Sequence, residues 1–295
     1  MVYLMNALEC HKVHVVACDL DDSLVATQSH SEQSRRASDE ALRQVGQLIT
    51  NLRTQGETVH FGSATGRTFA SVQELASKRS AFGEIFQTMD FHITSVGAAI
   101  YRQHEGASHF THIPNWPNVN SWNRAALIDR LSTYPDLTPQ EPTAQDDRKL
   151  SYRTTSITET TMHALQIGSY LGAASLQADV IVSGNGPWRF VDILPIGVNK
   201  GSALLQLPQL LESGLNDDSF SLSDNSVCRV AAGDSMNDQA VLAVADFSII
   251  PGNGQPDLLS WAADNQPAGS LYIANEPCAA GVLRGLQRHI YGYSN

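Results

Sequence analysis

Aspartates stand directly after apolar segments at two places far apart in the sequence. The segment VHVVACDLDDS ends an apolar run on Asp19 and Asp21, and the segment VAAGDSMND ends another on Asp234 and Asp238. Carboxylates that crowd together repel one another, which is costly unless a cation neutralises them. Because carboxylate oxygens prefer hard ions, the pattern favours a bound Mg²⁺ or Ca²⁺.

The first aspartate cluster does not have the sequence of a calcium-binding EF-hand loop. Counting from Asp19, the sixth position is Leu24 where Gly is needed, and the twelfth is His30 where Glu is needed. Mg²⁺ accepts few protein ligands together with a substrate phosphate, so it fits the pattern better than Ca²⁺. Asp22 gains no chemical role from this pattern, and we expect it to cap a turn.

Two other segments have the residue types that bind phosphate. Lys200 begins a predicted helix, where the helix dipole disfavours a cation unless an anion binds there. Thr65, Gly66 and Arg67 follow a short apolar segment, and a hydroxyl with backbone N–H groups in such a turn can hold phosphate oxygens. The alternative is that Lys200 is a solvated surface lysine and that the other segment is a simple turn in which Thr68 caps a helix.

The segments that must position these residues alternate between strand and helix. We expect Ser38 to cap the first helix and Gly56 to end it. Such alternation favours a parallel sheet covered by helices, in which chemistry gathers at the carboxyl ends of the strands. The predicted strands are 13–18, 58–62, 91–96, 227–232 and 247–250, and the predicted helices are 41–52, 69–76, 199–211, 236–244 and 279–290.

The middle of the chain has a different pattern. Residues 112–120, HIPNWPNVN, form a break rich in Pro and Asn that is typical of a linker. Beyond it the sequence predicts a small α+β unit, which interrupts the α/β alternation. We therefore predict a Rossmann-like parallel-sheet core formed by 1–116 and 193–295, with an inserted α+β domain at 117–192. The predicted elements of the insert are helices at 122–131 and 159–174 and strands at 149–155, 178–183 and 188–194.

Composition narrows the class of protein. The net charge of −11 argues against nucleic acid as the main partner, because a basic face is its usual footprint. No run reaches the roughly 18 apolar residues that a membrane span needs, and the N-terminus lacks the pattern of a signal peptide. The four cysteines form no CxxC pair, which indicates a reducing compartment. We expect a cytoplasmic protein with no membrane partner.

Taken together, the four motifs indicate a family. DLDDS, ATGR, NKGSAL and GDSMND stand in the order seen in the haloacid dehalogenase superfamily, and the chain resembles the phosphatases of that superfamily. The segment between the second and third motifs resembles the large α/β cap of its sugar phosphatases. The resemblance implies the α/β core and inserted cap domain predicted above.

A closer resemblance, to sucrose-phosphate phosphatase and its relatives, extends through most of the chain. It includes the segments FHITSVGAAIY, NVNSWNRAAL and VDILPIGVNKGSAL. The cap of that family carries two glutamines and a lysine before a Ser-Tyr or Ser-Phe strand, and Gln140, Gln145 and Lys149 match them. The family usually has Gly-Thr-Glu where residues 97–99 here read Gly-Ala-Ala, so a polar residue of the core edge that faces the sugar is missing.

The resemblance implies a Mg²⁺-dependent phosphatase that hydrolyses a sugar phosphate, such as sucrose-6-phosphate or a related glycosyl or disaccharide phosphate. Asp19 would be the nucleophile that forms an aspartyl-phosphate, and Asp21 the general acid and then the general base. Mg²⁺ would be bound by Asp19, the backbone carbonyl of Asp21 and Asp234, with Asp238 acting indirectly. The residues implied to hold the phosphate are Thr65, Gly66, Lys200 and Asn237, and those implied to bind the rest of the substrate are Arg67, Gln140, Gln145 and Lys149.

Several alternatives remain open at this point. The substrate is alternatively an amino-sugar phosphate or another small sugar phosphate of a biosynthetic pathway, or the protein is a non-catalytic sugar-binding relative. A sugar phosphomutase usually has a smaller helical cap between the first two motifs, where this chain has only one predicted helix. Trp188 and Tyr152 could stack on a sugar ring, although aromatic residues in a small domain more often belong to its core.

Overall fold

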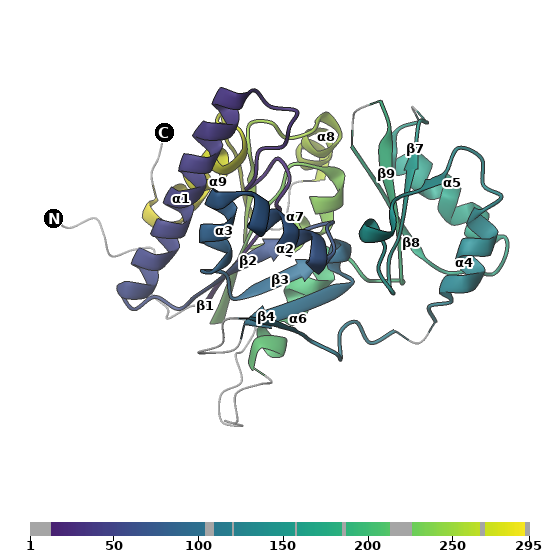
Figure 1. Ribbon diagram of the computed structural model, residues 1–295, viewed down its shortest axis with the longest axis horizontal. Coiled ribbons are helices and arrows are strands. Elements are labelled where there is room, and N and C mark those ends of the chain that lie inside the picture. Colours follow the sequence, from purple (N-terminus) through teal and green to yellow (C-terminus); the bar gives the residue numbers. More distant parts are fainter. Residues whose placement is uncertain are drawn as a thin grey trace.

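The structure is a computed structural model in which two β-sheets, each with its own helices, lie side by side (Figure 1). The larger sheet and its helices carry both predicted aspartate clusters, and the smaller sheet is formed by the middle of the chain. The residues that the structure describes are 13–103, 109–119, 121–156, 158–184, 187–212, 226–265 and 269–292.

The larger sheet has eight strands in the order β12-β11-β10-β1-β2-β3-β4-β5. In this order, neighbouring strands from β12 through β3 are parallel to each other. At the other edge, β4 pairs antiparallel with β3, and β5 pairs antiparallel with β4. The central strands are apolar on both faces, which is typical of a parallel sheet with helices on each side. The strands are β1 (Val13–Cys18), β2 (Val59–Ala64), β3 (Phe91–Thr94), β4 (Ala99–Gln103), β5 (Phe110–His112), β10 (Val227–Ala232), β11 (Phe247–Ile250) and β12 (Ser270–Ile273).

Helices cover both faces of this sheet because successive side chains of each strand point to opposite sides. In β1, Val16 belongs to one apolar core with α1, α3 and α9, whereas Val15 belongs to the other with α6, α7 and α8. The helices are α1 (Glu32–Thr54), α2 (Phe69–Lys78), α3 (Ser80–Phe86), α6 (Lys200–Glu212), α7 (Gln239–Val244), α8 (Pro256–Asn265) and α9 (Cys278–Tyr291).

The first helix begins earlier than the sequence predicts. Its N-cap is Ser31, whose side chain accepts a hydrogen bond from the backbone N–H of Ser34, so the prediction of Ser38 as the cap is wrong. Ser38 is buried within α1. The apolar periodicity detected only the part of the helix that packs on the sheet, because its first turns are polar and exposed. Gly56 follows the helix with a φ of 92°, as expected of a residue that ends a helix.

The smaller sheet has four antiparallel strands in the order β6-β7-β9-β8, with α4 and α5 packed on one face (Figure 1). In β7, Leu150 and Tyr152 belong to the apolar core under these helices. The alternate residues Ser151 and Arg153 therefore point to the opposite face. The elements are β6 (Thr138–Pro139), β7 (Leu150–Thr154), β8 (Asp179–Ser183), β9 (Arg189–Leu194), α4 (Arg124–Leu131) and α5 (Thr160–Gly172).

The predicted fold class, an α/β core with a mainly parallel sheet and a smaller α+β unit, is confirmed. The sequence did not predict α8 and β12, which extend the core beyond β11. Three short 3₁₀ helices complete the set of elements used below, namely η1 (Ser95–Gly97), η2 (Pro142–Ala144) and η4 (Met236–Asp238). None of the helices in the described segments is long and apolar enough to cross a membrane.

Candidate active site

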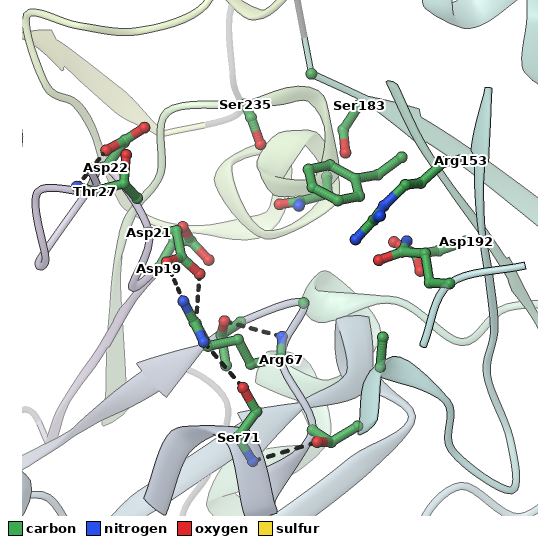
Figure 2. Close-up of a pocket in the computed structure, with 18 of the residues that line it drawn as sticks. Asp19, Asp21, Asp22, Thr27, Arg67, Ser71, Arg153, Ser183, Asp192 and Ser235 are labelled. Atoms are coloured by element: carbon green, nitrogen blue, oxygen red, sulfur yellow. Dashed lines mark hydrogen bonds and ion pairs between the residues drawn. The ribbon is translucent and has the colours of Figure 1, made fainter. Parts of the chain in front are cut away.

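A cavity of about 590 Å³ lies between the carboxyl ends of the large sheet's strands and the small sheet (Figure 2). Its volume is within the range of small-molecule binding sites. Asp19, Asp21 and Arg67 face it from the large sheet, and Arg153 and Asp192 face it from the small one. The predicted site residues that line it are Asp19, Asp21, Thr65, Gly66, Arg67, Gln140, Lys149, Asp234 and Asn237.

The register of β1 against β10 brings the two aspartate clusters together. Cys18 pairs with Ala232, and the backbone N–H of Asp19 donates to the carbonyl of Ala232 at 2.8 Å. The segments that follow β1 and β10 therefore leave the sheet at the same edge. Gly233 makes the approach possible, because a Cβ there would lie 2.3 Å from the carboxyl carbon of Asp238.

Lys200 lies beneath the cavity floor and connects these carboxylates. Its Nζ donates to Oδ1 of Asp19 at 2.8 Å, to Oδ1 of Asp238 at 2.7 Å and to Oδ1 of Asn237 at 2.8 Å. Burial alone would lower the pKa of Lys200, but the two carboxylates outweigh it and the pKa is raised. The alternative that Lys200 is a solvated surface lysine is wrong, because its side chain is completely buried.

The carboxylates nevertheless carry more charge than Lys200 offsets. Burial is the largest cause that raises the pKa of Asp19 to about 8, and Asp238 and Asp21 raise it further against the effect of Lys200. Burial, followed by the charges of Asp19 and Asp238, raises the pKa of Asp234 well above its usual range. Carboxylate oxygens of Asp19, Asp234 and Asp238 lie within 4.8 Å of one another, all buried. Such a set of oxygen donors with excess negative charge fits Mg²⁺.

Asp238 differs from the other two aspartates in how its oxygens are occupied. Its Oδ2 accepts hydrogen bonds from the backbone N–H groups of Asp234 and Ser235, and its Oδ1 accepts from Lys200. In Asp234, Oδ1 accepts only from the Ser23 hydroxyl, at 3.2 Å, among the contacts of the described residues. This arrangement favours Asp19 and Asp234 as direct metal ligands and an indirect, positioning role for Asp238.

Asp21 and Arg67, which both line the cavity, form a bidentate ion pair (Figure 2). Nε and Nη2 of Arg67 each lie 2.7 Å from an oxygen of Asp21. Burial lowers the pKa of Arg67, but the bond to Asp21 outweighs it and the pKa is raised. Ser71, which the sequence did not single out, accepts from Nη1 of Arg67 at 2.9 Å. The expectation that Thr68 caps the helix after this turn is also correct, because Thr68 is the N-cap of α2.

Lys149 connects the small sheet to the floor. Its Nζ donates to the carbonyl of Gly66 at 2.9 Å and lies 3.6 Å from Oδ1 of Asp192. The same Asp192 oxygen accepts from the hydroxyl of Ser151 at 2.6 Å. Although it is a cavity-lining carboxylate, Asp192 is absent from the predicted site. Its signal was available, because it is a charged residue inside the apolar strand β9.

The two predicted glutamines differ in their surroundings. Gln145 does not line the cavity, because its amide is bonded to backbone on both sides: Nε2 donates to the carbonyl of Ser151 at 2.8 Å and Oε1 accepts from the N–H of Ser151 at 2.9 Å. Gln140 lines the cavity, and its Nε2 donates to the carbonyl of Tyr152 at 3.0 Å. Gln145 thus shapes the loop that precedes β7, and Gln140 faces the cavity directly.

The outer part of the cavity has aromatic and charged residues. Trp188 lines it and is 39% exposed, with the guanidinium of Arg153 lying 4.8 Å from its ring centre. Arg153 also pairs with Glu141 at 2.9 Å. In contrast, Tyr152 is buried in the core of the small sheet, so of the two aromatic candidates only Trp188 is placed to contact a ligand. Ala98 and Ala99 are buried and do not line the cavity.

The fold, with aspartates at the carboxyl ends of β1 and β10, matches the fold of solved haloacid dehalogenase-like hydrolases. A solved structure of such a hydrolase from Bacteroides thetaiotaomicron is 15% identical with a TM-score of 0.53, over 94% of this chain and 99% of that one. The sucrose-phosphatase from Synechocystis, solved in complex with sucrose and phosphate, is 24% identical with a TM-score of 0.69, over 94% and 98% of the two chains. These likenesses show a shared fold.

The sequence then defines the family. Residues 12–290 match the family model of sucrose-6F-phosphate phosphohydrolase, so the chain belongs to that family of sugar phosphatases. Sucrose-phosphatase 2 of Nicotiana tabacum is 31% identical over 183 residues, which are 60% of this chain and 38% of that protein. The chain spans between 37% and 61% of the lengths of the plant sucrose-phosphatases that it matches.

Proposed function

We propose that this protein is a Mg²⁺-dependent phosphatase that hydrolyses a sugar phosphate through an aspartyl-phosphate on Asp19. The observation that carries the proposal is the contact of buried Asp19 with Lys200, beside Asp21, on the floor of a cavity that the small sheet covers. Membership of a sugar phosphatase family supports the same activity.

Asp19 has the surroundings that a nucleophilic carboxylate needs. Lys200 holds one of its oxygens, and the side chain lines the cavity. In the proposed reaction an oxygen of Asp19 attacks phosphorus, and the bond between phosphorus and the sugar oxygen breaks. Asp21 gives a proton to the leaving sugar oxygen and then removes one from the water that hydrolyses the aspartyl-phosphate. The products are inorganic phosphate and the free sugar, with Asp19 restored.

The residues that would hold Mg²⁺ are Asp19, Asp234 and the backbone carbonyl of Asp21, with Asp238 fixing their positions. When bound, the ion supplies positive charge that offsets the charge on the phosphoryl oxygens. The raised pKa values of Asp19 and Asp234 support this assignment. Repulsion between the carboxylates causes part of the rise, and a bound divalent cation would remove that repulsion.

The phosphoryl oxygens would be bound by the Thr65 hydroxyl, the Gly66 backbone, Lys200 and Asn237. Arg67 is held by Asp21 in this structure. A dianionic phosphate in the cavity would compete with Asp21 for the guanidinium, since Arg binds both groups in the same bidentate manner. Release of Asp21 in this way would leave its carboxyl group free to exchange protons with the substrate.

We propose that the inserted segment that begins at 117 forms a cap domain that selects the sugar, over a core formed by the rest of the chain. The predicted boundary at 192 lies within β9, so the proposed cap extends to the last residue of that strand, Leu194. Lys149, Asp192 and Gln140 present polar groups to the cavity, and Trp188 presents a ring face on which a sugar can pack. Sucrose-6-phosphate or a related disaccharide phosphate is the proposed substrate. The similarity of the chain to plant sucrose-phosphatases and to a structure with bound sucrose and phosphate supports it.

A phosphate-release screen over sugar phosphates tests the proposal. We expect release with Mg²⁺, none with a chelator, and the highest kcat/KM for a disaccharide phosphate. The variant Asp19→Asn should release no phosphate. Turnover that continues without a divalent metal would contradict the mechanism. Sugar binding without phosphate release from any compound would instead favour the non-catalytic alternative.

A further inference from the structure

Asp22, which has no role in the proposed reaction, lies in a cluster with His30 and Cys278. Nε2 of His30 is 3.2 Å from Oδ1 of Asp22 and 3.6 Å from Sγ of Cys278. One ligand atom from each residue lies within 4.8 Å of the others. The three residues come from the loop after β1, the segment before α1 and the first residue of α9.

We propose that this cluster is a second metal site, which binds Zn²⁺ or another borderline transition metal and is distinct from the Mg²⁺ site. The donor set decides the class of metal. Thiolate and imidazole are ligands of Zn²⁺ and similar ions, whereas Mg²⁺ requires oxygen ligands alone. The two sites would therefore take different metals from the same solution.

The distances fit a tetrahedral ion without rearrangement of the backbone. A Zn–S bond is about 2.3 Å long and a Zn–N bond about 2.05 Å. In a tetrahedral site the sulfur and nitrogen ligand atoms therefore lie about 3.6 Å apart, and the nitrogen and oxygen ligand atoms about 3.3 Å apart. The separations here are 3.6 Å for Sγ to Nε2 and 3.2 Å for Nε2 to Oδ1. A solvent molecule would complete the fourth position, as in zinc sites with three protein ligands.

The ligands are held in place by a common neighbour. The Asn253 side chain accepts from the backbone N–H of Cys278 at 2.7 Å and donates to the backbone carbonyl of Asp22, also at 2.7 Å. The backbone N–H of Thr27 donates to Oδ1 of Asp22 at 2.9 Å. These hydrogen bonds hold the backbone of Asp22 and Cys278 and one carboxylate oxygen of Asp22 in place. Ligand side chains in ordered metal sites are held by supporting hydrogen bonds of this kind.

A metal has a route to the cluster from the cavity. Asp22 lines the cavity and its side chain is 27% exposed, and His30 is 20% exposed, whereas Cys278 is buried. On binding, the Sγ–H bond breaks, the proton passes to solvent, and a metal–sulfur bond forms. The ion would tie the loop that carries Asp21 to α9 and remove the charge of Asp22 from the cavity edge.

Cobalt(II) titration of the full chain tests the proposal, because Co²⁺ replaces Zn²⁺ and a thiolate ligand gives a charge-transfer band in the near ultraviolet. The protein is first treated with a chelator and then saturated with Mg²⁺ to occupy the carboxylate site. We expect one equivalent of Co²⁺ to produce the band, and Zn²⁺ to abolish it by displacement. No band in the wild-type protein would overturn the proposal.

Variants assign the band to this cluster. Cys278→Ser should lose it, and His30→Gln should weaken Co²⁺ binding by at least about 100-fold, since even changes to supporting residues cost 10- to 100-fold. Cys228→Ser is the matched control, because Cys228 is the buried cysteine of a separate group with His14 and His289, and it should retain the band. A band that persists in Cys278→Ser or disappears only in Cys228→Ser would refute the assignment. Thermal unfolding of each variant shows whether it folds. If Cys278→Ser does not fold, the loss of Co²⁺ affinity in His30→Gln tests the assignment instead.

Discussion

Replacement of Lys200 by Met should show how much of the site's stability depends on one buried cation. The change removes the donor to Asp19 and Asp238 but keeps a side chain of similar length. Both carboxylates are buried, so they would be left without a compensating charge. Breaking a buried ion pair by removal of one partner costs about 3–5 kcal/mol. We expect a loss of that size in the free energy of unfolding at pH 7 without metal.

Denaturant unfolding with and without Mg²⁺ measures this loss. Saturating Mg²⁺ should reduce the difference between Lys200→Met and the wild type, because the cation offsets the same carboxylates. Adding Asp19→Asn to Lys200→Met should recover part of the stability, since the amide needs no counter-ion, whereas a buried carboxyl with a raised pKa must take up a proton to fold at pH 7. Phosphatase turnover of Lys200→Met should fall by about 10²- to 10³-fold, as for the loss of one donor to a transition state.

The matched control is Lys78→Met, which removes an exposed lysine that pairs with Glu74 on the surface of α2. Its stability and turnover should be close to those of the wild type, because exposed pairs contribute little. If Lys200→Met lost no more stability than Lys78→Met, or if Asp19→Asn lowered its stability further, Lys200 would not be the counter-ion of Asp19 and the electrostatic reasoning would be refuted.

Three further predictions concern the acid, the metal site and the core. Asp21→Asn should lower turnover of a sugar phosphate by about 10²- to 10⁴-fold but that of p-nitrophenyl phosphate much less, because nitrophenolate leaves without a proton; equal losses would exclude Asp21 as the acid. Gly233→Ala should weaken Mg²⁺ binding by about 10- to 100-fold in calorimetry, since its Cβ would displace Asp238; unchanged affinity would contradict the packing. Burial lowers the pKa of His92 to about 3. The unfolded state therefore binds a proton below pH 6.5 that the folded state does not, so stability falls by about 2–3 kcal/mol between pH 6.5 and 4.5; His92→Phe should reduce this fall, and an unchanged pH profile would refute the assignment.

The sequence predicted the edge of the sheet where the chemistry lies because local patterns determine it. Apolar runs that end on Asp19 and Asp234 mark two strand ends, and parallel strands bring such ends to one edge. The sequence also indicated that Lys200 needs an anion near it. It could not show that the partners are Asp19 and Asp238, because that depends on how α6 packs against α7 and η4, which follow β10.

Other features depend on contacts that no local pattern contains. The family resemblance made Gln145 a substrate-binding candidate, but the structure directs its amide to the backbone of Ser151. The bidentate pair of Asp21 with Arg67 joins residues 46 positions apart. The cluster of Asp22, His30 and Cys278 depends on the contact of His30 with Cys278, which lies 248 positions further along the chain, so neither turn propensity nor spacing could assign Asp22 these partners.

The most direct test of the proposed mechanism is to trap the phosphorylated enzyme. The protein is mixed with a radiolabelled disaccharide phosphate and Mg²⁺, quenched in acid during turnover, and digested, and the labelled peptide is sequenced. The label should be found on Asp19, should be lost in alkali as expected of an acyl phosphate, and should be absent in Asp19→Asn. Turnover with no labelled protein, or with the label on another residue, would contradict the role of Asp19 as the nucleophile.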